Sequence, residues 1–86
     1  MSDIQKNIKV QVLFFGATAE AVGKREVEID LETDTRAESA LQSILRKYPQ
    51  LENHSLLFAV NQEYARGDEM IKEGDELAVF TAVSGG

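Results

Sequence analysis

The chain has 86 residues, enough for one domain with a modest core, and fifteen acidic against nine basic residues give it a formal net charge of −6. Cysteine is missing, which excludes thiol nucleophiles, cysteine-bound zinc, iron–sulfur clusters and disulfides, and the acidity argues against nucleic acid or anionic lipid as a partner. No apolar run approaches the roughly 20 residues that cross a bilayer, and the start MSDIQKN lacks a signal-peptide stretch, so we expect a cytoplasmic protein without a membrane partner.

The first third of the chain predicts two paired strands. Residues 8–15 (IKVQVLFF) alternate as a strand whose second face begins polar and finishes apolar at Phe15. Residues 16–23 (GATAEAVG) can form one short helical turn that Gly23 closes. Residues 25–31 (REVEIDL) alternate more cleanly between apolar and acidic side chains. We therefore expect these two strands to form an antiparallel pair.

A helix is predicted in the middle of the chain. Thr35 and Glu38 match the capping box S/T-x-x-E, in which each side chain satisfies a backbone donor at the helix start. Apolar residues then recur at helical spacing on one face as far as Tyr48. Pro49 ends the helix, because proline lacks a backbone donor and restricts the residue before it.

The last third predicts strands separated by turns. Residues 55–61 (SLLFAVN) form a strand that continues into a turn and a short return strand (NQEYA), and residues 76–83 (ELAVFTAV) form the last strand. Two Gly-Asp-Glu triplets, at 67–69 and 74–76, lack the ligand spacing of a calcium loop. We interpret them as turns and expect no metal site.

The element order β-β-α-β-(β)-β is typical of an α+β domain, in which one main helix packs across a mixed sheet of four to five strands. A helix and a long crossover separate the first strand from the last, which permits parallel pairing of the two as central neighbours. No linker or repeat interrupts the chain. We therefore expect residues 1–86 to form a single domain, with 82–86 as a flexible C-terminal tail.

Strand alternation predicts an aromatic group on the sheet face away from the helix. If Leu77 and Val79 point inward, Phe80 points outward, and pairing of the first and last strands brings it close to Phe15. Tyr64, near the return strand, would join them. Exposed aromatics on a small acidic domain indicate a surface that binds other proteins. The alternative is that one phenylalanine belongs to the edge of the core.

Catalytic machinery is not evident in the sequence. His54 is the one histidine and is expected to be a solvated residue of the polar loop ENHS, and Ser84 has no general base nearby in sequence. No glycine-rich loop opens a helix, so we expect no phosphate cradle and no cofactor bound by this chain. Alone, the domain is not expected to be an enzyme.

The sequence ends in VSGG, and two final glycines raise a question because glycine holds structure poorly and contributes no packing. One interpretation is a frayed end. The other is that the terminal carboxylate of Gly86 is itself the working group.

Four motifs favour the second interpretation. VLFFGA in the first strand, AVNQEYA at the late hairpin, GDELAVF in the last strand and the final VSGG together resemble the small sulfur-carrier subunits of molybdopterin synthase, the MoaD-type family. The similarity extends from Ile8 to Gly86. It implies the ubiquitin-like β-grasp fold, which this family shares with the thiamine sulfur carriers and with ubiquitin.

The resemblance implies that Gly86 and Gly85 form the reactive end. An adenylyltransferase similar to ubiquitin-activating enzymes would couple the Gly86 carboxylate to AMP with ATP and magnesium, and a sulfur donor protein would convert it into a thiocarboxylate. The large catalytic subunit, expected in a heterotetramer, would accept the tail, and sulfur would pass to cyclic pyranopterin monophosphate to make molybdopterin. The positions implied to contact partners are Phe15, Tyr64, Phe80, Val83 and Ser84.

Two departures from the family keep other functions open. Thr81 and Ala82 stand where relatives have two prolines, and the arginine that relatives often carry before the residue corresponding to Glu20 is missing. The alternatives are a sulfur carrier for thiamine thiazole or another pathway, a ubiquitin-like modifier joined to lysines through Gly86, and a non-catalytic interaction module whose diglycine is incidental.

Overall fold

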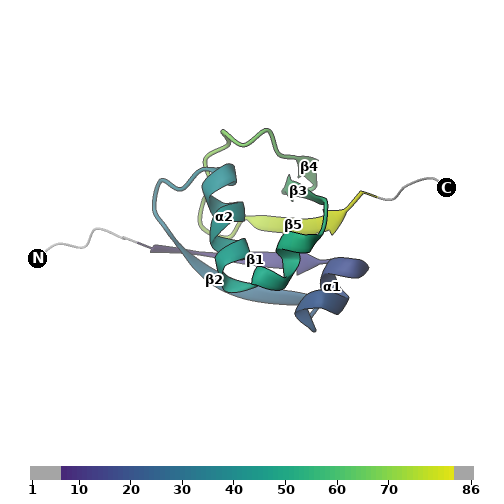
Figure 1. Ribbon diagram of the computed structural model, residues 1–86. Coiled ribbons are helices and arrows are strands. Elements are labelled where there is room, and N and C mark those ends of the chain that lie inside the picture. Colours follow the sequence, from purple (N-terminus) through teal and green to yellow (C-terminus); the bar gives the residue numbers. More distant parts are fainter. Residues whose placement is uncertain (1–6, 83–86) are drawn as a thin grey trace, which may run out of the picture.

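The computed structural model describes residues 7–82 (Figure 1). The part of the tail at 83–86, with its four predicted site residues, lies outside the described residues. The elements in chain order are β1 (Asn7–Phe14), α1 (Ala17–Val22), β2 (Glu26–Glu32), α2 (Ala37–Lys47), the 3₁₀ helix η1 (Pro49–Asn53), β3 (Leu56–Val60), β4 (Glu63–Tyr64) and β5 (Glu76–Thr81).

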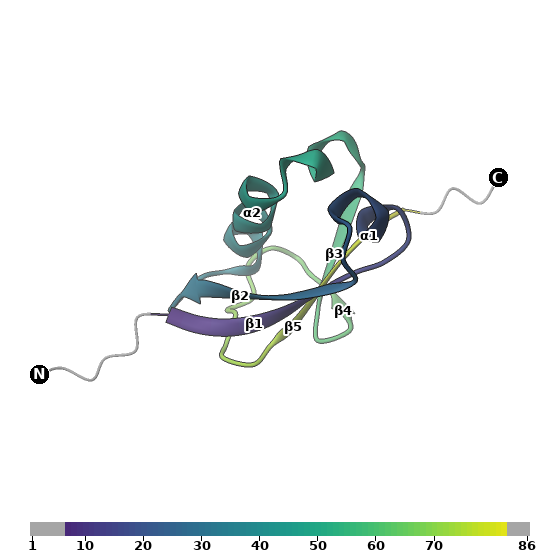
Figure 2. The same cartoon turned by 90° about the horizontal axis from the view of Figure 1, so that it is seen from below.

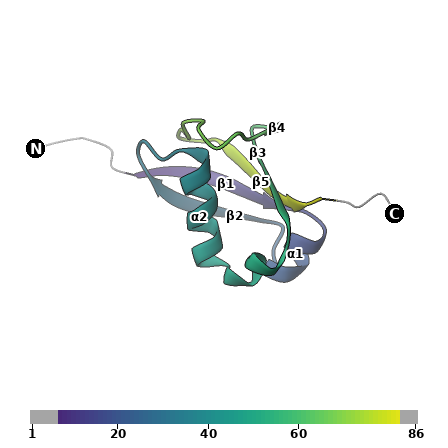
Figure 3. The same ribbon diagram turned by 45° about the horizontal axis from the view of Figure 1, so that its top comes forward.

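The strands form one mixed sheet in the order β2-β1-β5-β3-β4. β1 and β5 are parallel neighbours at its centre, and the pairs β1–β2, β3–β5 and β3–β4 are antiparallel. α2 lies across the strands in Figure 3, and Figure 2 shows α1 and α2 on the same side of the sheet. The predicted α+β architecture is confirmed, including the central parallel pair. None of the helices within residues 7–82 has the length and apolar character that a membrane crossing requires.

The core lies between the sheet and α2. Alternate side chains of three strands face it and are buried, as the alternation predicted: Ile8, Val10, Val12, Phe14, Ile29, Leu31, Leu77 and Val79. From the helix, Ala37, Ala40 and Ile44 are buried against them, and the Tyr48 ring packs edge-on against Phe14 with 5.6 Å between centroids. The same alternation leaves the other face of β1 and β5 outside this core.

The start of α2 differs from the expected capping box. The helix begins at Ala37, and no side-chain hydrogen bond caps it at Arg36. Thr35 Oγ1 instead donates to the carbonyl of Glu32 at 2.6 Å, which closes the turn before the helix. The prediction that Thr35 and Glu38 cap the helix is therefore wrong.

The loop formed by residues 66–69 caps α2 in its place. The backbone N–H groups of Ala37 and Glu38 donate to the carbonyls of Glu69 (2.8 Å) and Gly67 (3.0 Å). The Glu69 carboxylate accepts the backbone N–H groups of Arg66 (2.6 Å) and Gly67 (2.9 Å), and these bonds hold the pKa of Glu69 below its usual range. Two of the free donors at the helix start are thus satisfied by a segment far along the chain.

Candidate functional site

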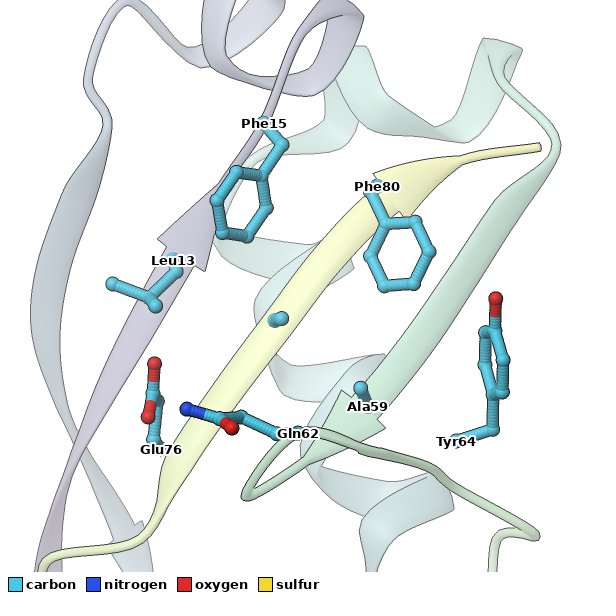
Figure 4. A pocket seen from close by; sticks show the side chains of 8 residues that line it. Leu13, Phe15, Ala59, Gln62, Tyr64, Glu76 and Phe80 are labelled. Atoms are coloured by element: carbon cyan, nitrogen blue, oxygen red, sulfur yellow. The ribbon is translucent and has the colours of Figure 1, made fainter. Parts of the chain in front are cut away.

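Three aromatic side chains gather on the outer face of the sheet, opposite α2. Phe15 and Phe80 meet edge to face with ring centroids 6.5 Å apart, and Tyr64 lies beside Phe80 at 6.0 Å. Phe15 is 51% exposed and Tyr64 is 71% exposed, while Phe80 is half-buried. We call these three residues the aromatic patch (Figure 4). The cluster predicted from strand alternation is present, and Phe80 does not lie under the helix.

The aromatic patch borders an open hollow of about 370 Å³. Five further residues line it with the patch, and the sequence analysis did not single them out as a site: Leu13, Ala59, Gln62, Glu76 and Ala78. Small side chains on β3 and β5 form its floor between the larger rings (Figure 4). A concave apolar surface of this kind is suited to receive an apolar side chain of another protein.

The sheet register brings these residues together. The parallel pairing aligns Leu13 with Ala78, and the antiparallel pairing places Ala59 opposite Ala78 and opposite Tyr64. One row of outward positions therefore runs from β1 across β5 and β3 to β4. Such a row depends on pairing between distant segments, which is why alternation within each strand alone did not reveal the hollow.

The β3–β4 hairpin places Tyr64. Asn61 and Gln62 both have left-handed backbone conformations (φ 51° and 72°), which two-residue hairpin turns require. The Asn61 side chain fixes the turn to the sheet, because its amide donates to Asp75 Oδ1 and its oxygen accepts the backbone N–H of Glu76, both at 3.0 Å. Tyr64 is thus carried on a braced turn despite the short length of β4.

The junction between β1 and α1 places Phe15. Gly16 turns the chain with φ 56°, a conformation that favours glycine. Thr18, in the first turn of α1, is fully buried, and its hydroxyl contacts the backbone of Phe15 and of Val79. The sequence analysis did not identify Thr18, because a threonine in a short helix carries no pattern of its own.

The other end of the outer face is charged. Lys9 Nζ donates to Asp30 Oδ1 at 3.1 Å, and this hydrogen bond raises the pKa of Lys9 above its usual value. Glu26 and Glu28 are exposed on β2, and Gln11 hydrogen-bonds to Glu26. The outer face therefore changes from apolar near Phe80 to predominantly acidic toward β2.

Residues 7–82 contain no group of three or more His, Asp or Glu side chains placed to hold a metal ion. His54 is half-buried where η1 ends, rather than fully solvated, and its backbone N–H donates to the carbonyl of Leu51 at 3.1 Å. The outer face presents the aromatic patch and its hollow, and the predicted reactive groups Gly85 and Gly86 lie outside the described residues together with Val83 and Ser84.

Comparison with known proteins relates this chain to a protein family. The model of the ThiS family matches residues 12–86. A molybdopterin synthase sulfur carrier subunit from Caenorhabditis elegans is 41% identical over 83 residues, which cover 92% of this chain and 99% of the relative.

Two solved structures extend the comparison. Small archaeal modifier protein 1 (SAMP1) from Haloferax volcanii superposes with a TM-score of 0.81 at 31% identity, over 91% of this chain and 99% of that one. A chain in the protein–protein complex of subunits 1 and 2 of the molybdopterin-converting factor from Helicobacter pylori has a TM-score of 0.68 at 23% identity, over 92% and 100%, and shows the shared fold. The resemblance drawn from the sequence is confirmed: the chain is a β-grasp protein of the ThiS family, to which it belongs together with the molybdopterin synthase sulfur carrier subunits.

Proposed function

We propose that the chain is the sulfur-carrying small subunit of a molybdopterin synthase. The aromatic patch docks the domain onto its protein partners, and the C-terminal glycine carries the sulfur. The observation that carries the proposal is the position of Phe80: an exposed aromatic cluster is built around β5, the strand that leads directly into the VSGG sequence. The docking surface and the reactive end are therefore joined by a few residues.

The chemistry takes place at the Gly86 carboxylate. A carboxylate oxygen attacks the α-phosphorus of ATP on an adenylyltransferase, pyrophosphate leaves with magnesium, and an acyl-adenylate forms. Hydrosulfide (HS⁻) delivered by the donor protein then attacks the acyl carbon, AMP leaves with the original carboxylate oxygen, the S–H proton passes to solvent, and a thiocarboxylate remains. In this proposal the adenylyltransferase and the sulfur donor supply the catalytic groups, and the described residues hold no group of three or more His, Asp or Glu side chains placed to bind a metal ion.

The loaded tail then delivers sulfur to the large subunit. There the thiocarboxylate sulfur bonds to cyclic pyranopterin monophosphate, and water cleaves the acyl–sulfur bond and returns Gly86 to a carboxylate. Two loaded tails supply the two sulfurs of the molybdopterin dithiolene. The Helicobacter pylori complex, in which a chain of this fold occurs with a second subunit, supports a large-subunit partner. A heterotetramer with two small subunits would allow both sulfurs to be delivered in one assembly.

The residues of the tail suit entry into a narrow site. Gly85 and Gly86 have no Cβ, so the backbone can pass where a side chain would clash. An extended chain advances ~3.3–3.6 Å per residue, so residues 82–86 reach about 17 Å from the end of β5. Val83 and Ser84 would then line the entrance, while the aromatic patch stays on the partner surface.

Intact-mass spectrometry tests the loading step. The full chain is incubated with its adenylyltransferase, ATP, magnesium and sulfide, and we expect a mass gain equal to replacement of one oxygen by sulfur, localised to Gly86. Gly86→Ala is expected to fold normally but to lose loading or transfer, because the added methyl group obstructs the end of the tail. An unmodified wild-type chain beside an adenylyltransferase that loads another carrier would reject the proposal.

The Haloferax volcanii relative keeps a second function in view, because its name describes a protein modifier. A modifier shares adenylation at the terminal glycine but ends in an amide bond to a lysine of another protein. Adding the large subunit and cyclic pyranopterin monophosphate to the loaded chain separates the functions. Molybdopterin formation supports the proposed client, a loaded tail that gives no molybdopterin indicates another sulfur pathway, and covalent adducts on denaturing gels indicate a modifier. A plain interaction module would show neither loading nor adducts.

A further inference from the structure

The hydrogen-bond ladder between β1 and β5 ends just before Phe15, the first residue of the aromatic patch. In this parallel pair, Gln11 N donates to Asp75 O at 3.0 Å, and the register aligns Phe14 with Val79. Parallel ladders repeat every two residues on both strands. Counting two residues along each strand from the Gln11–Asp75 bond, and then two more, predicts a bond from Phe15 N to Val79 O.

The hydroxyl of Thr18 occupies this step of the ladder. Phe15 N donates to Thr18 Oγ1 at 3.0 Å, and Thr18 Oγ1 donates to Val79 O at 2.7 Å. A hydroxyl has one proton to donate and lone pairs to accept, so it can link an N–H to a carbonyl in series. The Phe15 carbonyl, 2.9 Å from the hydroxyl, is an alternative acceptor that already receives the Thr18 N–H at 3.1 Å.

The inserted hydroxyl is sealed from solvent. Thr18 is 0% exposed, and among residues 7–82 it is the one polar residue that is buried. In the folded chain the hydroxyl supplies the partner that solvent would otherwise give to the Phe15 N–H and the Val79 carbonyl, and an unpaired buried N–H or carbonyl is unfavourable. A side chain from α1 thus connects Phe15, the residue that follows β1, to Val79 of β5, the residue before Phe80.

We propose that Thr18 is a positioning residue, whose hydroxyl acts as a spacer between β1 and β5 and thereby sets the separation of Phe15 and Phe80. A direct N–H···O bond joins its two atoms at about 2.9 Å, whereas here an oxygen atom is interposed. The spacing of the strands at this point determines how far apart the two rings sit and so the shape of the hollow. The inference rests on the proposed function, because it assigns to Thr18 the fit between the patch and the large subunit.

Three substitutions separate spacing from packing. Thr18→Ser keeps the hydroxyl and should preserve both bonds. Thr18→Ala removes the spacer and leaves room for Phe15 N to bond Val79 O directly, which draws the two strands together. Thr18→Val keeps the volume but places a methyl group between a donor and an acceptor, so the Phe15 amide should lose protection from hydrogen exchange.

A control variant removes packing from the same helix without touching the spacer. Val22 lies on α1, is half-buried and packs against the core. Val22→Ala should lower stability against urea, as a large-to-small change does, while both bonds of the Thr18 hydroxyl remain. The comparison between Thr18→Ala and Val22→Ala therefore distinguishes a positioning role from a merely structural one.

The first arm of the test uses the isolated chain. Ring-proton chemical shifts and contacts between Phe15 and Phe80 are measured by NMR for the wild type and the four variants. We expect changed ring contacts in Thr18→Ala, wild-type contacts in Thr18→Ser and Val22→Ala, and faster exchange of the Phe15 amide in Thr18→Val. Unchanged ring contacts in a folded Thr18→Ala would overturn the spacer. If that variant does not fold, unchanged exchange of the Phe15 amide in Thr18→Val would do so.

The second arm measures the dissociation constant with the large subunit by calorimetry. We expect Thr18→Ala to weaken binding about tenfold, the effect of disturbing a central aromatic contact. Thr18→Ser, which keeps the hydroxyl, should bind with the wild-type dissociation constant. Val22→Ala should bind as the wild type does. Equal loss of affinity in Thr18→Ala and Val22→Ala would contradict the proposal. If the wild type itself does not bind, the proposed function fails, while the spacing is still decided by the first arm.

Discussion

Phe14 and Phe15 are consecutive residues of the same type, yet they serve opposite faces of the sheet. Phe14 is 2% exposed and its ring packs edge-on against Tyr48 of the helix side, with centroids 5.6 Å apart. Phe15 is 51% exposed and meets Phe80 in similar edge-to-face geometry at 6.5 Å. The two ring contacts have similar geometry, and the rings differ in how much of their surface is exposed. The buried ring of Phe14 stabilises the fold, whereas the exposed ring of Phe15 is accessible from outside.

The neighbouring strand repeats the division. Val79 is fully buried and Phe80, the next residue, belongs to the aromatic patch. Because β1 and β5 are paired with Phe14 opposite Val79, the two inward residues and the two outward residues each form a matched set. A β-strand can therefore carry folding and docking on alternate residues, and mutations should separate the two properties.

Phe14→Ala should have the largest effect. Removal of a buried phenylalanine costs about 3–5 kcal/mol of unfolding free energy, a large share of the roughly 5–15 kcal/mol that stabilises a small domain. Urea unfolding measures the loss, and Phe14→Leu provides a milder variant if the alanine variant does not fold. A stability close to that of the wild type would mean that Phe14 does not hold the core.

Phe80→Ala should act on binding instead. Its ring is half-buried on the outer face, so truncation should weaken large-subunit binding by more than about 1 kcal/mol if it is an anchor. Calorimetry with the large subunit measures this change, and urea unfolding of the same variant gives the accompanying loss of stability. Unaltered affinity would remove Phe80 from the proposed docking surface.

The coupling of Phe15 with Phe80 should be smaller. An edge-to-face pair contributes about 0.5–1.5 kcal/mol beyond its buried area, and much of that contact is already exposed here. A double-mutant cycle of Phe15→Ala and Phe80→Ala, measured by urea unfolding, isolates the term. Strict additivity would show that the two rings lie together without stabilising each other.

Glu69→Gln should have the smallest effect, limited to stability and dependent on pH. The backbone N–H groups that bind this carboxylate lower its pKa in the folded chain, so the charged form contributes stability above the usual value of 4.5. That contribution is lost as the pH falls below 4.5 through the lower folded pKa. The urea midpoints of wild type and Glu69→Gln should therefore converge in acid. If the difference between the two urea midpoints did not change with pH, the folded chain would not lower the pKa of Glu69.

The sequence predicted most of the fold because most of it follows from local periodicity. Alternation identified the inward and outward faces of β1 and β5, and Pro49 marked the end of α2. Alternation also predicted that Phe15, Tyr64 and Phe80 lie together, once the parallel pairing of the first and last strands was assumed. The role of that patch, and those of Val83, Ser84, Gly85 and Gly86, stay predictions for the binding and loading experiments.

The features that were missed depend on contacts between distant segments. Thr35 and Glu38 match a capping box by spacing, but backbone carbonyls of the 66–69 loop reach the helix start and satisfy its donors. Thr18 matters only because the register of β1 and β5 leaves a step of the ladder for its hydroxyl. Both relationships join residues that are far apart in the chain, so a local stretch of sequence does not reveal them.

The central position of β5 also determines how the domain responds when its C-terminus is pulled. β5 is hydrogen-bonded to β1 on one side and to β3 on the other. A force applied to the chain after Ala82 is therefore resisted by two ladders in shear, instead of peeling an edge strand one bond at a time. We therefore expect the domain to stay folded under a pull on its C-terminus that would detach an edge strand.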